Sequence, residues 1–549
     1  MNGSDRASTP VRSLSALVLV FTGCASDVPA STAIDVAIAA SGSVNVTLHP
    51  GPAAVIGSTG VVSFGIPFPR MALRDTGLLR AFDDDGVELP IHVRETLRWR
   101  AWPGAGTRES IRAAVVSIEI RLDDRSPHRI RLEYGAAPSV TMGAPADPLA
   151  SWVAVTDGEF PAGTVKEPRV YASVPTWWLS RCLLRGHVQR IGAQPAMSWF
   201  DDFMVGAAHT AVNDVPPEVT ERINYTTDYE PWLFDRTATL FGVYARTGDV
   251  QWLRHAHRSA QFYRAHIDAA GYFDLKGDDL KYSYGRSLLI DYMFTGDAAD
   301  IAAIRRVASA GDSWDPTYEL DTSFWTERHQ TYAFLAALSA WEATGEAAYA
   351  DRAQTIADIS FDMAADPLGS WHADGCMLHG MTAHEGAGGN VPICSPWMSA
   401  LFADAVSEYY LHSRDQRALT FLAGLGHYVR EYGLYGGGEG LDVDMPWYLS
   451  SSVKTFSDEG PWGDIEHTCD VAGLVARGAW AERELGRDTT ALEQTLDTLL
   501  ISCEENLSMW HRPGSESVGK AEWRLSPPRK FNWWFGTTSD LTWIMAALR

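Results

Sequence analysis

The sequence predicts an α+β multidomain protein, with an N-terminal β-sandwich or barrel followed by an α/α toroid. Two patterns predict this fold class. Between residues 41 and 145, apolar and polar residues alternate, which is typical of half-buried strands. Between residues 240 and 500, an apolar run, a short polar turn and a second apolar run occur together five times, which is typical of repeated αα-hairpins.

The first 24 residues resemble an export signal. Arg6 and Arg12 precede an apolar run from Leu14 to Phe21, which is too short to span a bilayer. The run ends in Thr22-Gly23-Cys24 and resembles a bacterial lipobox, with Phe21 in place of the usual Leu. Cleavage there makes Cys24 the lipidated first residue. We therefore expect an exported protein, lipid-anchored at the bacterial cell envelope on its periplasmic or outer side. A freely secreted protein, or a soluble one with a chance apolar start, are the alternatives.

Residues 25–40 form a linker of small residues, and residues 41–145 a β-sandwich-like domain. Its period-two segments include Val44–Leu48 and Val115–Ile120, and they are separated by turns such as Asp83-Asp84-Asp85-Gly86. Residues 146–170 contain several Pro and Gly residues and form a connector. From the alternation of short strands and turns we expect a sandwich or barrel.

Residues 171–549 form the predicted toroid. The five turns read Thr247-Gly248-Asp249, Thr295-Gly296-Asp297, Thr344-Gly345-Glu346, Ser413-Arg414-Asp415 and Gly486-Arg487-Asp488. Gly (Arg in the fourth turn) suits the end of one helix, and the acidic residue lies near the positive N-terminus of the next. The acidic positions are 48, 49, 69 and 73 residues apart, too irregular for a thin solenoid. We expect a ring whose inner helices bury an apolar core and whose inserted loops wall a cleft at one end. The last helix, from Thr538 onward, closes the ring.

Composition restricts the partners. A formal net charge of −24 argues against nucleic acid as a ligand. The chain has 21 Trp, 19 Tyr and 20 Phe residues, which favours a carbohydrate ligand, because aromatic rings stack on sugars, although most of these rings fill helix contacts. It contains no phosphate-binding glycine loop and no Gly-x-Ser-x-Gly motif, so we expect no cofactor.

The remaining cysteines fit an oxidising compartment. Cys376 and Cys394 can clamp the long loop between them, and Cys469 and Cys503 can join two helices of one hairpin, although spacing alone does not fix the pairing. Cys182 would then stay reduced. A zinc site is the alternative for one loop, and its candidate ligands are His372, Cys376, His379, His384 and Cys394. Their spacing matches no zinc signature, so we expect no metal.

Three motifs of the β-region carry a resemblance to a known family. They are Phe64-Gly65-Ile66-Pro67-Phe68-Pro69-Arg70, Asp85-Gly86-Val87-Glu88-Leu89-Pro90 and Ser110-Ile111-Arg112. Together they resemble the leading domain of exo-rhamnogalacturonan lyase-like and ulvan lyase-like proteins, which continue into an α/α toroid with polysaccharide lyase chemistry. The resemblance covers about one hundred residues at motif level and implies glycan degradation. It departs from the family pattern at Ala113, where the family has Trp, and no separate β-domain follows the toroid.

A lyase acting on a uronate needs a group that neutralises the carboxylate, a base, and an acid for the leaving oxygen. His329, His384 and Tyr284 are the candidates for these catalytic roles. The alternative is that these side chains have a structural role, as helix caps or core residues. A hydrolase needs two carboxylates, for which the candidates are Glu385 and an acidic residue of the 458–466 loop, Glu466 or Asp464. Asp228 and Glu230 are further options. Residues expected to bind substrate are Tyr229, Arg286, Arg328, Asn390, Trp397, Trp462 and Glu466.

The sequence therefore predicts an exported enzyme that degrades a polysaccharide, with β-elimination of a uronic-acid-containing glycan as the first hypothesis. An inverting glycoside hydrolase and a non-catalytic glycan-binding lipoprotein are the alternatives. The expected partner is the polysaccharide, with membrane contact only through the lipid anchor. The sequence leaves the oligomeric state open.

Overall fold

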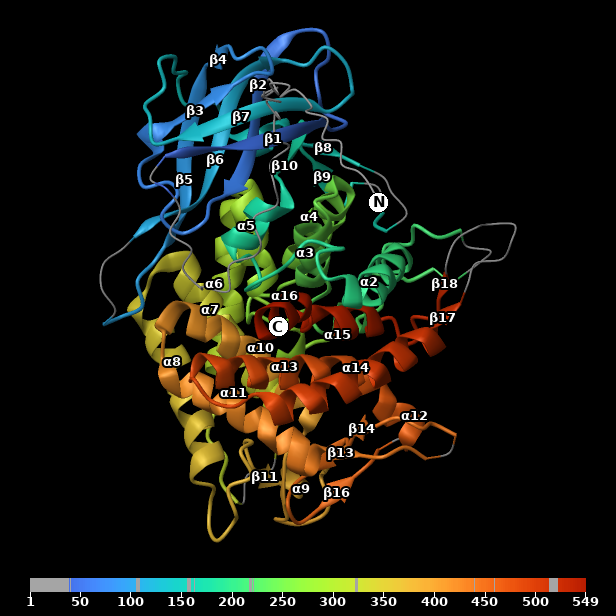
Figure 1. Cartoon of the computed structure of the whole chain (residues 1–549). Coiled ribbons are helices and arrows are strands. Elements are labelled where there is room, and N and C mark those ends of the chain that lie inside the picture. Colours follow the sequence, from blue (N-terminus) through green and yellow to red (C-terminus); the bar gives the residue numbers. More distant parts are fainter. Residues whose placement is uncertain are drawn as a thin grey trace, which may run out of the picture.

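The computed structural model describes residues 39, 41–104, 109–155, 159–161, 163–216, 220, 222–320, 324–438, 440–458, 460–512 and 522–549 (Figure 1). The expected lipidation site, Cys24, and the rest of the signal segment lie outside the described residues. Within them, no helix has the length and apolar character needed to cross a membrane. The described chain is a mixed α and β structure, with its two larger sheets before its α-helices in sequence.

The β-region contains two antiparallel sheets, at the top of Figure 1. One has the order β10-β1-β7-β3-β4, formed by Val170–Ser173, Gly42–Pro50, His128–Tyr134, Leu79–Phe82 and Glu88–Leu89. The other has the order β2-β6-β5, formed by Thr59–Pro67, Ser110–Arg121 and Ile91–Trp99. In β1, Val44, Val46 and Leu48 are buried and alternate with more exposed residues, as the period of two predicts. A small hairpin, β8 (Val153–Ala154) and β9 (Lys166–Glu167), follows in the predicted connector.

Strand β6 is buried along nearly its whole length, because one face packs within the β-region and the other on a helix. Strands β2 and β6 both contact α5 (Arg286–Thr295). A Cβ atom at Gly65 would lie 2.3 Å from the backbone of Phe294, so only glycine allows this close approach. The β-region is thereby fixed against the helices.

The helices alternate between two layers. The inner layer is α3 (Arg236–Thr247), α5, α7 (Glu327–Thr344), α10 (Pro396–Ser413), α13 (Thr468–Glu484) and the pair α15 (Lys530–Gly536) and α16 (Leu541–Leu548). The outer layer is α2 (Ser198–Ala211), α4 (Val250–Ala265), α6 (Ala298–Asp312), α8 (Ala347–Ala365), α11 (Gln416–Tyr428) and α14 (Thr490–Trp510). Inner helices are buried nearly all round, whereas outer helices such as α8 and α14 bury one face.

Contacts between inner helices close a ring. Each of α3, α5, α7, α10 and α13 contacts the next, α16 contacts α13, and α15 contacts α3. The remaining helices are short: α1 (Thr176–Cys182), α9 (Met381–Glu385) and α12 (Pro461–Asp464). The loops contain four pairs of two-residue antiparallel strands. They are β11 (His379–Gly380) with β12 (Pro392–Ile393), β13 (Leu434–Tyr435) with β14 (Met445–Pro446), β15 (Leu449–Ser450) with β16 (Thr455–Phe456), and β17 (His511–Arg512) with β18 (Glu522–Trp523).

The repeated turns are built by local hydrogen bonds. Gly248 ends α3 with φ 70°, and the side chain of Asp249 accepts a hydrogen bond from the first turn of α4. The Thr247 hydroxyl donates to the carbonyl of Val243 and accepts from the N–H of Asp249 at 3.2 Å. The same bond from the acidic residue's N–H to a Thr or Ser hydroxyl, at 3.1–3.2 Å, occurs in the next three turns. Arg414 takes the left-handed conformation, φ 57°, where the other turns use Gly.

The turns face the β-region. Arg94 donates to the carbonyl of Gly296 at 3.3 Å, and Arg100 donates to the carbonyl of Glu342, close to the turn at Gly345. Since α3, α5, α7, α10 and α13 all end at these turns, their N-terminal ends gather at the opposite end of the ring. The β11–β16 hairpins, α9 and α12 lie at the bottom of Figure 1, away from the β-region at the top.

Two disulfides are present among the described residues. Cys376 bonds to Cys394, which closes the long loop before α10, and Cys469 bonds to Cys503, which joins α13 to α14. These are the two pairs suggested by sequence. Cys182 is buried and carries a free thiol.

The centre of the ring differs from the expected apolar core, because charged side chains fill it. Asp404 of α10 accepts hydrogen bonds from Arg286 at 2.5 Å and from Arg477 at 3.0 Å. Arg477 also pairs with Asp540 at 2.7 Å, next to α16. Burial acts to raise the pKa of Asp404, but Arg286, Arg477 and Arg185 outweigh it and hold that pKa below its ordinary value. We call these residues, with those of the next paragraph, the axial network.

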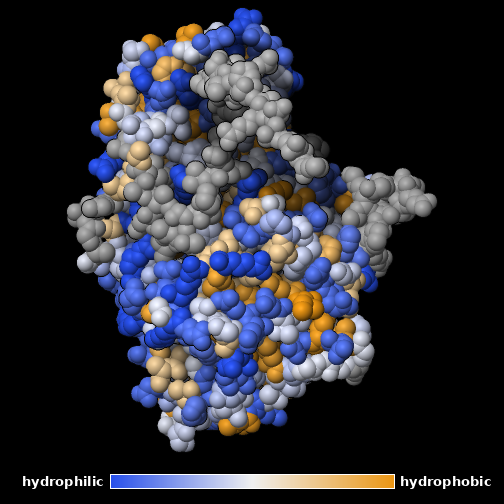
Figure 2. Space-filling view, in the orientation of Figure 1, coloured by the Kyte–Doolittle hydropathy of each residue, from blue (hydrophilic) through white to orange (hydrophobic). Residues whose placement is uncertain are grey.

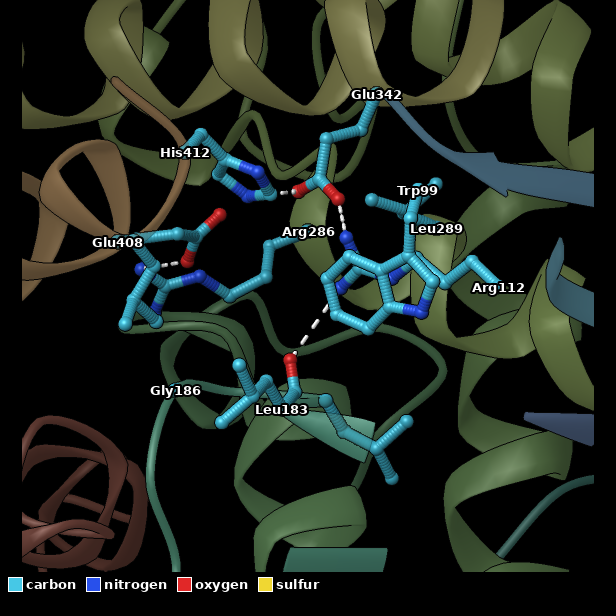
Figure 3. A pocket seen from close by; sticks show the side chains of 11 residues that line it. Trp99, Arg112, Leu183, Gly186, Arg286, Leu289, Glu342, Glu408 and His412 are labelled. Carbon is cyan, nitrogen blue, oxygen red and sulfur yellow. Dashed lines mark hydrogen bonds and ion pairs between the residues drawn. The ribbon is translucent and has the colours of Figure 1, made fainter. Parts of the chain in front are cut away.

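The axial network reaches the β-region (Figure 3). Arg112 of β6 pairs with Glu342 of α7, and Glu342 also pairs with His412 of α10 at 3.1 Å. Arg286 pairs with Glu408 at 2.7 Å. These residues, with Arg112, Glu342 and His412, line a small cavity of about 10 Å³. A side chain of the β-region is therefore part of the charged interior of the ring.

We predict that Arg477→Met lowers the free energy of unfolding by about 3–5 kcal/mol, since it leaves buried carboxylates without their partner. Urea unfolding followed by tryptophan fluorescence measures this. Arg487→Met is the matched control, because its side chain is half exposed and its loss should change stability by less than about 0.5 kcal/mol. Equal unfolding midpoints for the two variants would contradict the prediction.

Candidate active site

A cavity of about 360 Å³ opens where the N-terminal ends of the inner helices meet. We call it the central cavity. Six helices, α3, α5, α7, α10, α13 and α15, each contribute to its lining from their first turn or from the six residues before it. These lining residues are Glu230, Tyr282, Arg328, Trp397, His467 and Arg529. These ends carry the positive poles of the helix dipoles, so the cavity favours a ligand with negative charge.

Aromatic rings form much of the wall. The His467 ring stacks on Trp397 with centroids 4.5 Å apart and lies 4.1 Å from Trp533. Tyr448 lies 5.9 Å from Trp397, and Tyr229 also lines the cavity. Flat apolar surfaces with polar edges suit the faces of sugar rings.

Two cations in this wall have no acidic partner among the described residues. Lys276 lies 4.6 Å above the ring of Tyr229, and Arg328 lies 5.5 Å from that of Trp397. Within the described part of the chain, neither has a carboxylate at ion-pair distance. By contrast, Arg529 pairs with Glu230. Unpaired cations are notable in a protein of net charge −24, and they leave room for an acidic ligand.

Buried polar atoms of the wall also lack partners. The Nε atom of Arg328, the Nε1 atom of Trp397 and the Nδ1 atom of His467 are buried without a hydrogen bond to any described residue. Such groups are uncommon in folded proteins and cost free energy unless a ligand or water satisfies them. Their convergence on one cavity points to a polar ligand.

His467 is held neutral. Burial lowers its pKa well below the ordinary value, and the positive charges of Lys530, Arg529 and Arg328 lower it further. Its Nδ1 atom lies 3.6 Å from a carboxylate oxygen of Asp470, whose own pKa is raised by burial. A neutral imidazole at the wall of a cavity can accept a proton, which makes His467 a candidate general base.

Four carboxylates line the same cavity: Glu230, Asp458, Asp464 and Glu466. Glu230 pairs with Arg529, and Glu466 pairs with Lys530. Asp464 is buried and accepts a hydrogen bond from the hydroxyl of Tyr435 at 2.6 Å. Glu230, Asp464 and Glu466 are thus each bonded to a donor. No group of described residues has the His, Cys, Asp and Glu composition of a metal site.

A second cavity of about 480 Å³ adjoins the first. We call it the side cavity. It shares Lys276, Lys281 and Arg328 with the central cavity, so these cations stand on the wall between the two. Burial lowers the pKa of Lys281, and the neighbouring positive charge of Arg328 lowers it further, while Asp279 at 3.0 Å opposes both.

The structure brings several predicted site residues together. Tyr229, Arg328, Trp397 and Glu466 line the central cavity. His329 lines the side cavity, where its Nδ1 atom lies 2.7 Å from the hydroxyl of Thr326. Burial lowers the pKa of His329, against the opposing effect of Asp279. Trp462 is 51% exposed, beside the cavity residue Gly463.

Other predicted residues lie elsewhere. Tyr284 is buried and outside the cavity lining; its hydroxyl donates to the carbonyl of Lys281 at 2.7 Å and accepts from the N–H of Phe234. Arg286 belongs to the axial network rather than the cleft. Both side chains are fully engaged within the fold, so neither suits the catalytic or substrate-binding role assigned from sequence.

The 376–394 loop contributes less than expected. His384 contacts the sulfur of Met398 at 3.3 Å and lies 5.8 Å from Tyr448, outside the lining of both cavities. Asn390 is exposed at the end of the loop. Glu385 is the last residue of α9. The loop therefore supports the cleft through Tyr448 instead of supplying its lining.

Sequence reasoning included His467 only as the last residue of a candidate loop, and gave no role to Arg529 and Trp533. Each stands just before or within the first turn of an inner helix, the same position as Arg328 and Trp397. Reading that position before every apolar helix would have found them. Lys276 and Tyr448 lie on loops and carry no such signal.

No protein-family model and no curated protein sequence matches the chain. Some solved structures resemble it in shape. An unsaturated glucuronyl hydrolase from Streptococcus agalactiae is 12% identical, with a TM-score of 0.42, over 64% of this chain and 92% of that one. An α-1,6-mannanase of Salegentibacter is 12% identical, with a TM-score of 0.41, over 62% and 99%. Cellobiose 2-epimerase from Bacillus thermoamylovorans is 10% identical, with a TM-score of 0.40, over 61% and 98%. We draw nothing about the reaction from these likenesses.

We predict that His467 stays neutral at pH 6.5, where a free histidine is half protonated. Burial and three nearby cations disfavour its charged form. As the pH falls below 6.5, the unfolded chain takes up a proton here that the folded protein does not, so this residue lowers stability in acid. NMR of histidine-labelled protein, with His467→Gln to assign the signal, measures the titration. A midpoint at or above pH 6.5 would contradict the assignment.

Proposed function

We propose that this chain is an enzyme that cleaves a uronic-acid-containing glycan by β-elimination in the central cavity. One observation carries the proposal: two unpaired cations and a neutral histidine share an aromatic-walled cavity. The cations suit the carboxylate of a uronate, and the histidine suits the proton beside it.

Binding comes first. The substrate carboxylate lies against Arg328 and Lys276, which lack an acidic partner among the described residues. The sugar ring packs on the aromatic wall beside Trp397 and Tyr448. Neutralising the carboxylate makes the hydrogen on the adjacent carbon more acidic, because the negative charge that develops in the transition state is stabilised.

The chemical step needs a base and an acid. His467 takes the proton from the carbon that bears the carboxylate, and the electron pair of that bond forms a carbon–carbon double bond. The bond from the next carbon to the glycosidic oxygen breaks, and the oxygen leaves with its electron pair. Tyr282 donates a proton to it; burial raises the pKa of this phenol, so it is protonated at neutral pH. Deprotonated Tyr282 and protonated His467 then exchange protons with water.

Glycoside hydrolysis is the second candidate function. Glu230, Asp464 and Glu466 line the same cavity, and a hydrolase needs an acid and a base among such carboxylates. In this alternative, one carboxyl group protonates the leaving oxygen and another activates water. A glycan-binding protein without chemistry is the remaining alternative.

We also infer that the protein is exported and anchored to a bacterial membrane through Cys24. The N-terminal sequence and the two disulfides, which suit an oxidising compartment, support this inference. Labelling of cells with a clickable fatty acid tests it: the unmodified protein becomes labelled, whereas Cys24→Ala stays unlabelled. Equal labelling of both would refute the anchor.

The reaction is tested with a panel of uronate polymers. We predict rising ultraviolet absorbance from unsaturated chain ends. His467→Gln should lower turnover about 100- to 10,000-fold while binding persists, because it removes only the base. Arg328→Met should raise KM.

Arg487→Met is the matched control and keeps full activity, since its side chain is half exposed and far from the cleft in the turn at Gly486. New reducing ends without absorbance would favour the hydrolase, and binding without either product would favour the non-catalytic alternative. Full activity of His467→Gln would remove this residue from the mechanism.

A further inference from the structure

The side cavity is larger than the central cavity, yet the proposed reaction does not use it. The two have volumes of about 480 and 360 Å³ and share the cations Lys276, Lys281 and Arg328. A ligand bound in one cavity therefore touches the same positive groups as a ligand bound in the other. This arrangement suits one chain-like ligand that occupies both.

The side cavity has its own aromatic surface. Trp314 lines it, and its Nε1 atom donates to the side chain of Gln330 at 2.7 Å. Gln330 is itself buried and donates to the hydroxyl of Ser360 at 2.9 Å. His329 stacks on the Trp314 ring with centroids 5.3 Å apart. The indole is thus held in one orientation before any ligand arrives.

Phe324 completes this surface. It is 48% exposed and stands perpendicular to the His329 ring, with centroids 4.9 Å apart. An exposed aromatic ring beside a fixed indole forms an apolar corner at the cavity wall. Asp279, on the same lining, offers carboxylate oxygens to hydroxyl groups. The apolar corner suits the face of a sugar ring, and the carboxylate of Asp279 suits its hydroxyl groups.

We propose that the side cavity is a second sugar subsite, which holds the neighbouring unit of an acidic glycan whose reacting unit occupies the central cavity. Lys276, Lys281 and Arg328 bind an anionic group, carboxylate or sulfate, at the junction of the two units. The proposal rests on the proposed function for the identity of the central ligand. The proposal adds that the glycan ligand has at least two sugar units, with an anionic group where the two units join.

Binding to the inactive His467→Gln variant tests the subsite without turnover. Titration calorimetry compares a methyl uronoside with the uronate trimer. We expect the trimer to bind more tightly, and Trp314→Ala to reduce that advantage about 3- to 10-fold while the affinity for the single unit stays unchanged. Trp177→Ala, at an exposed tryptophan of α1 near the turn end of the ring, is the matched control and leaves both affinities unchanged.

The anionic group is tested with two further trimers of neutral sugars, one sulfated and one plain. Either the uronate or the sulfated trimer should bind with an affinity that Lys276→Met reduces, and this identifies the group. Equal binding of the plain trimer would overturn the acidic junction. An unchanged trimer advantage in Trp314→Ala would overturn the subsite. If trimer binding requires Trp314 but the unmodified protein forms no unsaturated product from the uronate polymers, the subsite stands and the lyase proposal falls. If neither ligand binds, both proposals fall.

Discussion

The pairing of charges on the axis of the ring governs the rest of this structure. Asp404 receives hydrogen bonds from Arg286 and Arg477, which belong to different inner helices, and Arg477 continues to Asp540. Buried carboxylates and guanidinium groups are tolerated only in fixed geometry, because a displaced partner leaves a charge in a medium that solvates it poorly. The inner helices are therefore held in one register by directional bonds as well as by apolar packing. Arg112 extends the same constraint into the β-region.

The direction of the helices decides where chemistry can occur. Every inner helix of the first four hairpins ends at a turn whose hydroxyl and acidic residue fix the reversal. The turns at Gly296 and Gly345 contact the β-region. The opposite ends converge around Arg328, Trp397 and His467. Helix dipoles, unpaired cations and aromatic rings accumulate there without any long-range sequence motif. The cleft is thus a consequence of repeating one hairpin in one direction.

The hairpins and their turns could be predicted from sequence because their determinants are local: a hydroxyl, a glycine and an acid within three residues. The same logic found Arg328 and Trp397, which begin apolar helices. It failed for Arg286, which also begins a helix but points toward Asp404, 118 residues away. It failed for Tyr284, whose hydroxyl meets the backbone of Phe234, 50 residues away. Whether such a residue faces the cleft or the axis depends on partners that neighbouring sequence does not contain.

The filled interior of the ring limits how substrate enters and product leaves. Beyond the cleft, charged side chains of the axial network fill the described interior, and the pockets that they line measure about 10 and 20 Å³. A polymer cannot pass through the ring, because the cleft is closed at its inner end. Substrate and product therefore use the same opening of the cleft. A new substrate chain can bind only after the product has dissociated.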